Sequence, residues 1–253
     1  MRLLLDIGNT SVHWQLESSA SCAGQANINK TRHGETWQKT WGNINRSLPA
    51  KQITSVMVAS VLSPGTNKAI EHALAQEIAA PIIFYQAEAE RLGFHNSYPN
   101  PEKLGVDRWL AILEAWHRQG ACAVIDCGSA ITIDVANNSG LHLGGYIVPG
   151  YSMLVQALHQ GTAQVKVQQE WPSSLVLANS TAQAVNNGCA KMCASFINQV
   201  LLEVEEMCGD LAVYLTGGDA NSFVELIQKK IIVDDSLVLR GLSRVAKDML
   251  RGH

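Results

Sequence analysis

The feature that most constrains the fold is a short strand, turn and strand unit that occurs twice in the chain. Near the start, the apolar run Leu3-Leu4-Leu5 is followed by Asp6, a turn over residues 8–11, and a segment with alternating apolar residues. About 120 residues later, Ala123-Val124-Ile125 again precedes Asp-x-Gly-Ser, and alternation follows again. Alternation with a period of two is typical of strands. Two copies at half-chain spacing indicate a duplicated domain.

The residues of these turns suit the binding of an anion. Gly8 permits a tight backbone turn, and such a turn directs consecutive N–H groups at one point, where a nucleotide phosphate can lie. Asp6 beside it could hold the Mg²⁺ that accompanies phosphates. Because strand character resumes directly, the unit is not a strand-to-helix P-loop. An ordinary hairpin with Asx-type capping fits the first turn equally well, but the recurrence of the unit favours a phosphate site.

Composition restricts the class of partner. The chain has 253 residues, 47% apolar and 16% charged, which is typical of a globular protein of one large domain or two of about 120 residues. A net charge of −3 without a basic run predicts no nucleic acid and no anionic membrane surface as partner. No apolar run is long enough for a membrane span or a targeting signal, so we expect six reduced cysteines in a cytoplasmic protein.

The order of elements predicts an α/β architecture. Apolar segments at 53–62 and 81–85 read as strands, and an amphipathic segment at 68–79 between them reads as a helix. In the second half, we expect a helix from about 181 to 208 and a last helix over 238–249. Sheets covered by helices are the expected result.

A second informative region lies between the two repeats. Gly105 and Asp107 fall where a helix with one apolar face begins, after the irregular segment Tyr98-Pro99-Asn100-Pro101. The simpler interpretation makes Asp107 an N-terminal cap and Arg108 a surface residue, and spacing alone favours it. The alternative makes Asp107 a general base, with Arg108 positioning an anionic substrate group.

Glycine pairs mark two further places where backbone can approach a ligand. Gly144-Gly145-Tyr146-Ile147-Val148-Pro149-Gly150 joins a strand to a helix, and Thr216-Gly217-Gly218-Asp219 ends a buried strand. A plain strand with glycine-rich turns is an equally good interpretation of the first.

Five motifs together resemble the type III pantothenate kinases. They are Asp6-Ile7-Gly8-Asn9-Thr10, Gly105-Val106-Asp107-Arg108, the segment from Asp126 to Asp134, the segment from Gly144 to Gly150, and Thr216-Gly217-Gly218-Asp219. Each motif is weak alone, but the set is specific and covers nearly the whole chain. The resemblance implies an α/β fold of two duplicated ribonuclease-H-like (actin-like ATPase) domains, at 1–119 and 120–253, with the active site in the cleft between them.

The resemblance also implies a reaction and its nucleotide site. The reaction is ATP-dependent phosphorylation of pantothenate to 4′-phosphopantothenate, the first step of coenzyme A biosynthesis. The ATP phosphates would be bound by Asp6, Ile7, Gly8, Asn9, Thr10, Ser11, Val12, His13 and Ser129, with Asp6 near Mg²⁺. The family usually has Thr at the position of Ser129, so we expect altered ATP affinity at most, because the hydroxyl is kept.

The remaining roles follow from the same resemblance. Asp107 would be the catalytic base, and pantothenate would be held by Tyr98, Gly105, Val106, Asp107 and Arg108. Thr181 would contact pantothenate from the partner subunit of a homodimer. Asp126 would ligate the monovalent cation, K⁺ or NH₄⁺, that the family uses.

Two other functions compete with this one. A sugar or other small-alcohol kinase would share both phosphate turns but gives no reason for the Gly-x-Asp-Arg segment. A non-catalytic accessory regulator of transcription, related to the same family, would be favoured by a missing base or a broken turn. Asp6, Asp107 and Asp126 are all present.

Overall fold

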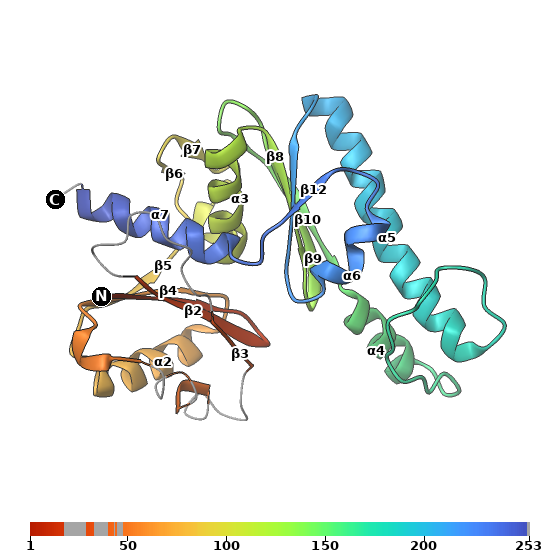
Figure 1. The fold of residues 1–253 in the computed structure, drawn as a ribbon, viewed down its shortest axis with the longest axis horizontal. Coiled ribbons are helices and arrows are strands. Elements are labelled where there is room, and N and C mark those ends of the chain that lie inside the picture. Colours follow the sequence, from red (N-terminus) through yellow and green to blue (C-terminus); the bar gives the residue numbers. More distant parts are fainter. Residues whose placement is uncertain (18–28, 33–39, 43, 45–47, 252–253) are drawn as a thin grey trace. The chain divides into compact units, whose positions relative to one another are not determined.

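The chain forms two compact units. The computed structural model describes residues 1–17, 29–32, 40–42, 44 and 48–251. Unit 1 comprises Met1–Glu114 and Ser236–His253, and unit 2 comprises Ala115–Asp235 (Figure 1). The sequence led us to expect a division at 119/120 with all later residues in the second domain. The units differ from that division chiefly in their assignment of the C-terminal segment.

Unit 1 is built on a five-stranded sheet. Its order is β3-β2-β1-β4-β5, in which the first three strands are antiparallel and β1, β4 and β5 are parallel. The strands are β1 (Arg2–Ile7), β2 (Ser11–Glu17), β3 (Asn29–Arg32), β4 (Ser55–Ser60) and β5 (Ile82–Tyr85). A two-stranded hairpin, β6 (Glu90–Arg91) and β7 (Phe94–His95), and short 3₁₀ helices at Ala50–Gln52 and Pro101–Lys103 complete the unit's smaller elements.

One face of this sheet packs on α2 (Pro64–Glu77). Leu3, Leu5 and Ile7 of β1 share a buried cluster with Ile70 and Leu74 of the helix. The helix starts four residues earlier than the amphipathic pattern indicated. Its N-cap is Ser63, whose hydroxyl accepts a hydrogen bond from the Thr66 N–H at 3.2 Å, and the next residue is a proline, which fits the first helical position.

The other face of the sheet is covered by the C-terminal helix, α7 (Leu237–Arg251), which contacts β1, β2 and β4 (Figure 1). Gly241 lies so close to α3 (Val106–Gln119) that a Cβ there would overlap the Leu110 backbone. The Arg244 Nε donates to the Glu114 carboxylate at 2.7 Å. The C-terminal segment therefore belongs to unit 1 because its buried face completes the core of that sheet.

Unit 2 repeats the same sheet. Its order is β10-β9-β8-β11-β12, again with three antiparallel strands followed by parallel pairing of β8, β11 and β12. The strands are β8 (Cys122–Cys127), β9 (Ala130–Ala136), β10 (His142–Pro149), β11 (Ala212–Thr216) and β12 (Ile231–Val233). The corresponding order and directions confirm the duplication that the two Asp-x-Gly turns predict.

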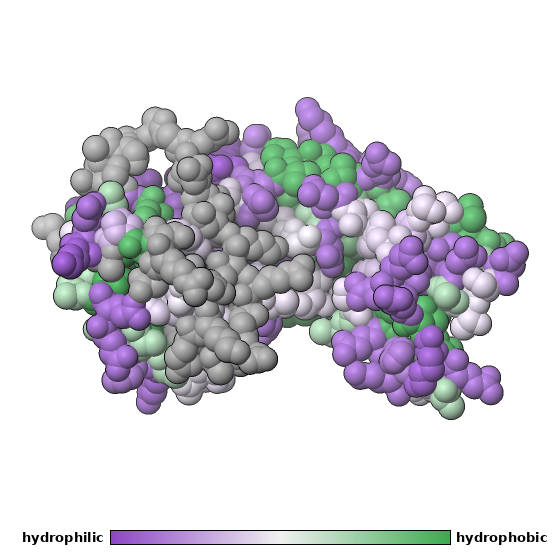
Figure 2. All heavy atoms as spheres, turned by 60° about the horizontal axis from the view of Figure 1, so that its bottom comes forward, coloured by the Kyte–Doolittle hydropathy of each residue, from purple (hydrophilic) through white to green (hydrophobic). Residues whose placement is uncertain are grey.

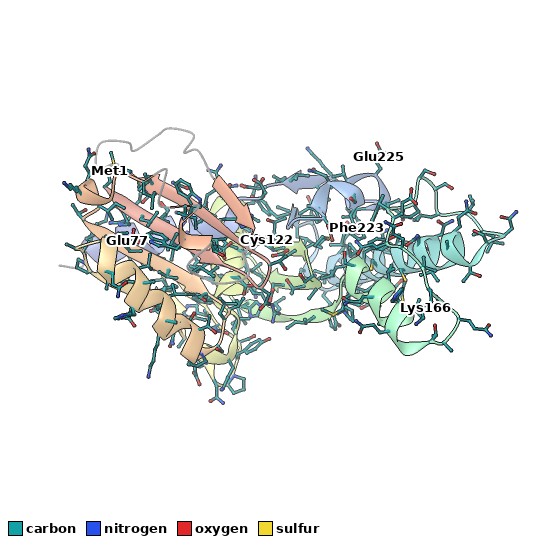
Figure 3. All side chains as sticks on the ribbon, turned by 90° about the horizontal axis from the view of Figure 1, so that it is seen from below. Met1, Glu77, Cys122, Lys166, Phe223 and Glu225 are labelled. Carbon is teal, nitrogen blue, oxygen red and sulfur yellow. The ribbon has the colours of Figure 1, made fainter. Side chains whose placement is uncertain are left out.

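The core of unit 2 joins the sheet to a long helix. The helices are α4 (Tyr151–Gly161), α5 (Thr181–Cys208), α6 (Ala220–Phe223) and a 3₁₀ turn at Val224–Leu226. Phe223 is 1% exposed and lies among the side chains of unit 2 (Figure 3). Its ring packs edge-on against Trp171 at a centroid distance of 5.0 Å, and Trp171 packs similarly on Tyr151 at 4.8 Å. The predicted helix over 181–208 is confirmed.

The surface mixes polar and apolar residues on the face drawn in Figure 2. Exposed apolar side chains in unit 2 include Tyr146 and Ile147 on β10 and Met153 on α4. In the part of the chain that the structure describes, none of the helices has the length and apolarity that crossing a membrane requires.

Candidate functional site

The first turn has the geometry that its sequence predicts. Ile7 of β1 pairs with Val12 of β2, and the turn between them is closed by a hydrogen bond from the Gly8 N–H to the Ser11 carbonyl at 3.0 Å. Asn9 and Thr10 lie exposed at its tip. The strand, turn and strand prediction is confirmed, and the exposed tip is accessible to a ligand.

Asp6 and His13 face each other at the base of this turn. They occupy paired positions on β1 and β2, and the Asp6 Oδ2 lies 3.4 Å from the His13 Nδ1. The two side chains are 15% and 23% exposed, respectively, so both are accessible to solvent. The Asp6 carboxylate supplies the hard oxygen donor that Mg²⁺ prefers.

The start of α3 positions the proposed base. The Gly105 carbonyl accepts the first helical hydrogen bond, from the Trp109 N–H at 2.9 Å, and Asp107 is the second helical residue. The Asp107 Oδ1 accepts a hydrogen bond from the backbone N–H of Arg108 at 2.8 Å. Asp107 is half-buried and lies inside the first turn, one position past the helix start, so it satisfies a first-turn amide without being the N-cap residue itself. A carboxylate can hold such a bond and still accept a proton.

Arg108 differs from the simpler interpretation, which made it a surface residue. It is only 8% exposed, and its Nη1 donates to the Tyr98 hydroxyl at 3.2 Å. A buried guanidinium retains a full positive charge and its planar set of donors. The structure therefore brings together Tyr98 and Arg108, two of the residues predicted to hold an anionic substrate.

The second turn is tighter than the first. Cys127 pairs with Ile131, and the Gly128 N–H donates to the Ala130 carbonyl at 3.0 Å. Ser129 is exposed at the tip, and its carbonyl accepts from the Gly150 N–H at 2.9 Å. A Cβ on Gly150 would lie 2.7 Å from the Ser129 carbonyl oxygen, so no larger residue fits. This close approach is what the glycines of the segment ending at Gly150 predicted.

Gly217, which directly follows β11, lies against the same turn. Its φ is +98°, and a Cβ there would overlap the Asp126 Oδ1 and the Cys127 carbonyl. The Cys127 carbonyl also accepts from the Asp219 N–H at 2.8 Å. Burial, assisted by the charges of Asp126 and Asp219, raises the pKa of the Cys127 thiol well above its usual value. Cys127 is therefore a neutral packing residue beneath the turn.

Asp219 is a residue whose role the sequence analysis left unassigned. Its backbone is tied to the second turn, and its carboxylate lies near enough to affect the pKa of Cys127. The available signal was its position directly after the glycine pair that ends β11. Asp126 and Asp219 thus both add negative charge near this turn.

Thr181 is the first residue of α5 and is exposed. The N-cap is its neighbour Ser180, whose hydroxyl accepts a hydrogen bond from the Gln183 N–H at 3.4 Å. Thr181 therefore lies next to the cap of α5, and its contact with a second subunit stays a prediction.

The donor set limits how metal ions can be held. Within the described residues, no three His, Cys, Asp or Glu side chains gather closely enough to form a protein-only metal site. Asp6 and Asp126 each present carboxylate oxygen, which suits Mg²⁺ and alkali cations. Each residue fits a site completed by nucleotide oxygens, backbone carbonyls or water.

Two hollows in unit 2 lie away from the turns. One, of about 460 Å³, is bordered by Glu205, Asp210 and Lys229, and the other, of about 370 Å³, by Trp171, Asn179 and Gln183. Neither is lined by Asp126, Ser129 or Thr181.

Comparisons with known proteins agree along the whole chain. The family model for type III pantothenate kinase matches residues 2–203. The type III pantothenate kinase of Alcanivorax borkumensis is 36% identical over 247 residues, which cover 97% of this chain and 98% of that protein. The type III pantothenate kinase of Nitrosococcus oceani is 34% identical, with 98% and 94% covered.

Solved structures show the same fold at low identity. MreB 5 of Spiroplasma citri, bound to AMPPNP, matches with a TM-score of 0.53 and 11% identity over 100% of this chain and 98% of that one. A ROK family glucokinase from Streptomyces griseus, in complex with glucose and AMPPNP, matches with a TM-score of 0.52 and 9% identity over 98% and 99%. The duplicated units are those of the actin-like ATPase fold, and the chain belongs to the type III pantothenate kinase family.

Proposed function

We propose that this protein transfers the γ-phosphoryl group of ATP to the 4′-hydroxyl of pantothenate, forming 4′-phosphopantothenate for coenzyme A biosynthesis. The observation that carries the proposal is family membership over nearly the full chain, together with the presence of Asp6, Asp107 and Asp126. Phosphoryl transfer depends mainly on positioning and charge stabilisation, so phosphate turns, a bound cation and one base are sufficient.

In unit 1, the start of α3 supplies the acceptor side of the reaction. Asp107 would orient the primary alcohol and take its proton as the new P–O bond forms, because an alcohol is a poor nucleophile without such help. Arg108 is buried and positively charged, and its bond to Tyr98 fixes the direction of the guanidinium. This arrangement supports recognition of the pantothenate carboxylate by Arg108 and Tyr98, with Gly105 and Val106 shaping the backbone next to the substrate.

The two turns supply the nucleotide side. Backbone N–H groups and hydroxyls of residues 6–13 in unit 1, and Ser129 in unit 2, would donate hydrogen bonds to the phosphates. Asp6 would hold Mg²⁺ and Asp126 a monovalent cation, and these ions would neutralise phosphate charge when bound. Exposure of both turn tips supports this assignment.

We also assign a homodimer in which Thr181 of one subunit contacts pantothenate bound to the other. Its support is the family, together with the exposure of Thr181 at the start of α5. An exposed hydroxyl at a helix N-terminus is available for a polar contact with a ligand.

The test is a product assay with several alcohols. Purified protein is incubated with ATP, Mg²⁺ and either pantothenate, glucose or glycerol, and products are identified by mass spectrometry. We expect phosphopantothenate and no phosphorylated sugar. A phosphorylated sugar without phosphopantothenate would replace the proposal with the sugar-kinase alternative. ATP binding without any product would favour the non-catalytic regulator.

A further inference from the structure

One amide side chain organises the segment that carries Tyr98. Asn96 follows β7 in unit 1 and is half-buried. Its Nδ2 donates to two backbone carbonyls, those of Glu88 and Pro101, each at 3.2 Å. Its Oδ1 accepts from the backbone N–H of Tyr98 at 3.0 Å. The Asn96 side chain thus links the backbone of Glu88 and Pro101, which lie on either side of it in sequence, to the backbone of Tyr98.

These contacts require a side chain that has both an NH₂ donor group and a carbonyl acceptor, as asparagine does. Both Nδ2 hydrogens meet carbonyl oxygens and the Oδ1 meets an N–H, so the amide orientation is determined by its partners. The main chain of Asn96 is fixed as well, because its N–H donates to the Ala89 carbonyl at 2.9 Å. An alanine at this position would remove all three side-chain bonds, and a serine would retain only an acceptor for the Tyr98 N–H.

Asn96 is connected to Arg108 through two hydrogen bonds of Tyr98. The backbone of Tyr98 is held by Asn96, and the Tyr98 hydroxyl accepts from the Arg108 Nη1 at 3.2 Å. Asn96 therefore determines where the tyrosine hydroxyl meets the guanidinium. Segments that lack regular backbone pairing depend on such side-chain bonds for their order.

We propose that Asn96 is a positioning residue for pantothenate, which acts by holding Tyr98 in place to orient Arg108. The inference rests on the proposed function, since it assigns Tyr98 and Arg108 to pantothenate. It predicts a selective effect. Loss of the Asn96 amide weakens pantothenate binding while the use of ATP is unchanged, because the hydrogen bonds of this side chain go to the backbone of Glu88, Pro101 and Tyr98 and not to the first turn.

The chain contains a matched control in Asn198 on α5. Its Nδ2 donates to the carbonyls of Ala194 and Leu226 at 3.0 and 2.8 Å, and its Oδ1 accepts from the Gln228 N–H at 2.8 Å. Asn198 is half-buried like Asn96 but lies in unit 2, and none of these three hydrogen-bond partners is a predicted site residue. Asn198→Ala therefore removes the same three types of bond without touching the segment of Tyr98.

The experiment measures KM for pantothenate, KM for ATP, kcat and the thermal midpoint for the wild type, Asn96→Ala and Asn198→Ala. We expect Asn96→Ala to raise KM for pantothenate about tenfold, with KM for ATP changed less than about twofold. Asn198→Ala should lower the thermal midpoint comparably but leave both KM values unchanged. Asn96→Ser should fall between the wild type and Asn96→Ala, and it replaces the alanine variant if that one does not fold.

A double-mutant cycle tests the route through Tyr98. In a Tyr98→Phe background, which lacks the hydroxyl that accepts from Arg108, Asn96→Ala should add less than about threefold to KM for pantothenate. Unchanged KM for pantothenate in Asn96→Ala and Asn96→Ser, with an active wild type, would overturn the inference, as would equal effects of Asn96→Ala and Asn198→Ala. Absence of phosphopantothenate from the wild type would instead refute the proposed function.

Discussion

The two Asp-x-Gly turns occupy the same place in two copies of one sheet, yet their surroundings differ. The first turn places four residues between its last paired positions, and within the described part of the chain a Cβ on Gly8 would meet the Ser11 carbonyl alone, at an ordinary 3.5 Å. The second turn places three residues between its last paired positions. Gly150 and Gly217 lie so close to this turn that a side chain on either would collide with the backbone of the turn. One copy is open and the other is enclosed by main chain.

We propose that this difference reflects a division of roles between the two copies. The open turn offers side chains at its tip and the Asp6–His13 pair at its base. The enclosed turn offers carbonyl oxygens and Asp126 in a position fixed by its neighbours. Fixed oxygen donors suit a cation, whereas an accessible turn with N–H groups and hydroxyls suits phosphates. The predictions below test this comparison and the separate role of α3.

The largest expected effect lies at neither turn but at Asp107. Asp107→Asn keeps the side-chain oxygen that accepts from the Arg108 N–H but cannot take a proton. We expect kcat to fall by about 10²- to 10⁴-fold, with a thermal midpoint within about 4 °C of the wild type. Steady-state kinetics and thermal unfolding check this. Unchanged kcat would leave Asp107 with its capping role only.

The contrast between open and enclosed turns predicts unequal effects of one added methyl group. Gly217→Ala introduces a Cβ at a φ of +98° and against the Asp126 and Cys127 atoms. We expect a loss of about 2–4 kcal/mol in the free energy of unfolding, measured by urea denaturation. Gly8→Ala, in the open turn, should cost less than about 1 kcal/mol. Equal losses would remove the distinction between the turns.

Asp126→Asn tests the cation role of the enclosed turn. An amide oxygen is a weaker, neutral ligand, so we expect turnover in potassium to fall about tenfold while turnover in sodium changes little. Glu90→Gln, on an exposed strand of unit 1, is the control for removing one carboxylate. A variant that retains the full preference for potassium would place the cation elsewhere.

The smallest effect is expected at Ser129. Ser129 is exposed at the tip of the second turn, and Ser129→Thr adds one methyl group and keeps the hydroxyl. We expect KM for ATP to change by less than about threefold. A larger change would show that the enclosed character of this turn extends to its tip.

Local patterns predicted much of the fold. Apolar runs identified the strands before the two turns and alternation identified those after them, and the helix expected over about 181–208 was found with those bounds. The assignment of α7 to unit 1 did not follow, because an amphipathic helix fits any apolar sheet face of suitable width. The start of α2 at Pro64 was also missed, since the apolar period begins after the capping residues.

The site was predicted by residue type more than by environment. Motif spacing indicated that Asp107 and Arg108 lie at a helix start, but burial of Arg108 and its bond to Tyr98 depend on the conformation of the chain between them, which includes the 3₁₀ helix Pro101–Lys103. The role of Asp219 depends on a contact with the distant backbone of Cys127, and that of Asn96 on contacts with backbone atoms of residues two to eight positions away. Such contacts leave no periodic signal.

The most direct test of the account measures ADP release by the wild-type protein with ATP and Mg²⁺, with and without pantothenate, in potassium or in sodium as the only monovalent cation. The account predicts turnover that requires pantothenate and is strongly favoured by potassium, since acceptor and cation sites would both be in use. A folded protein that binds ATP but releases no ADP with pantothenate in either salt would contradict it.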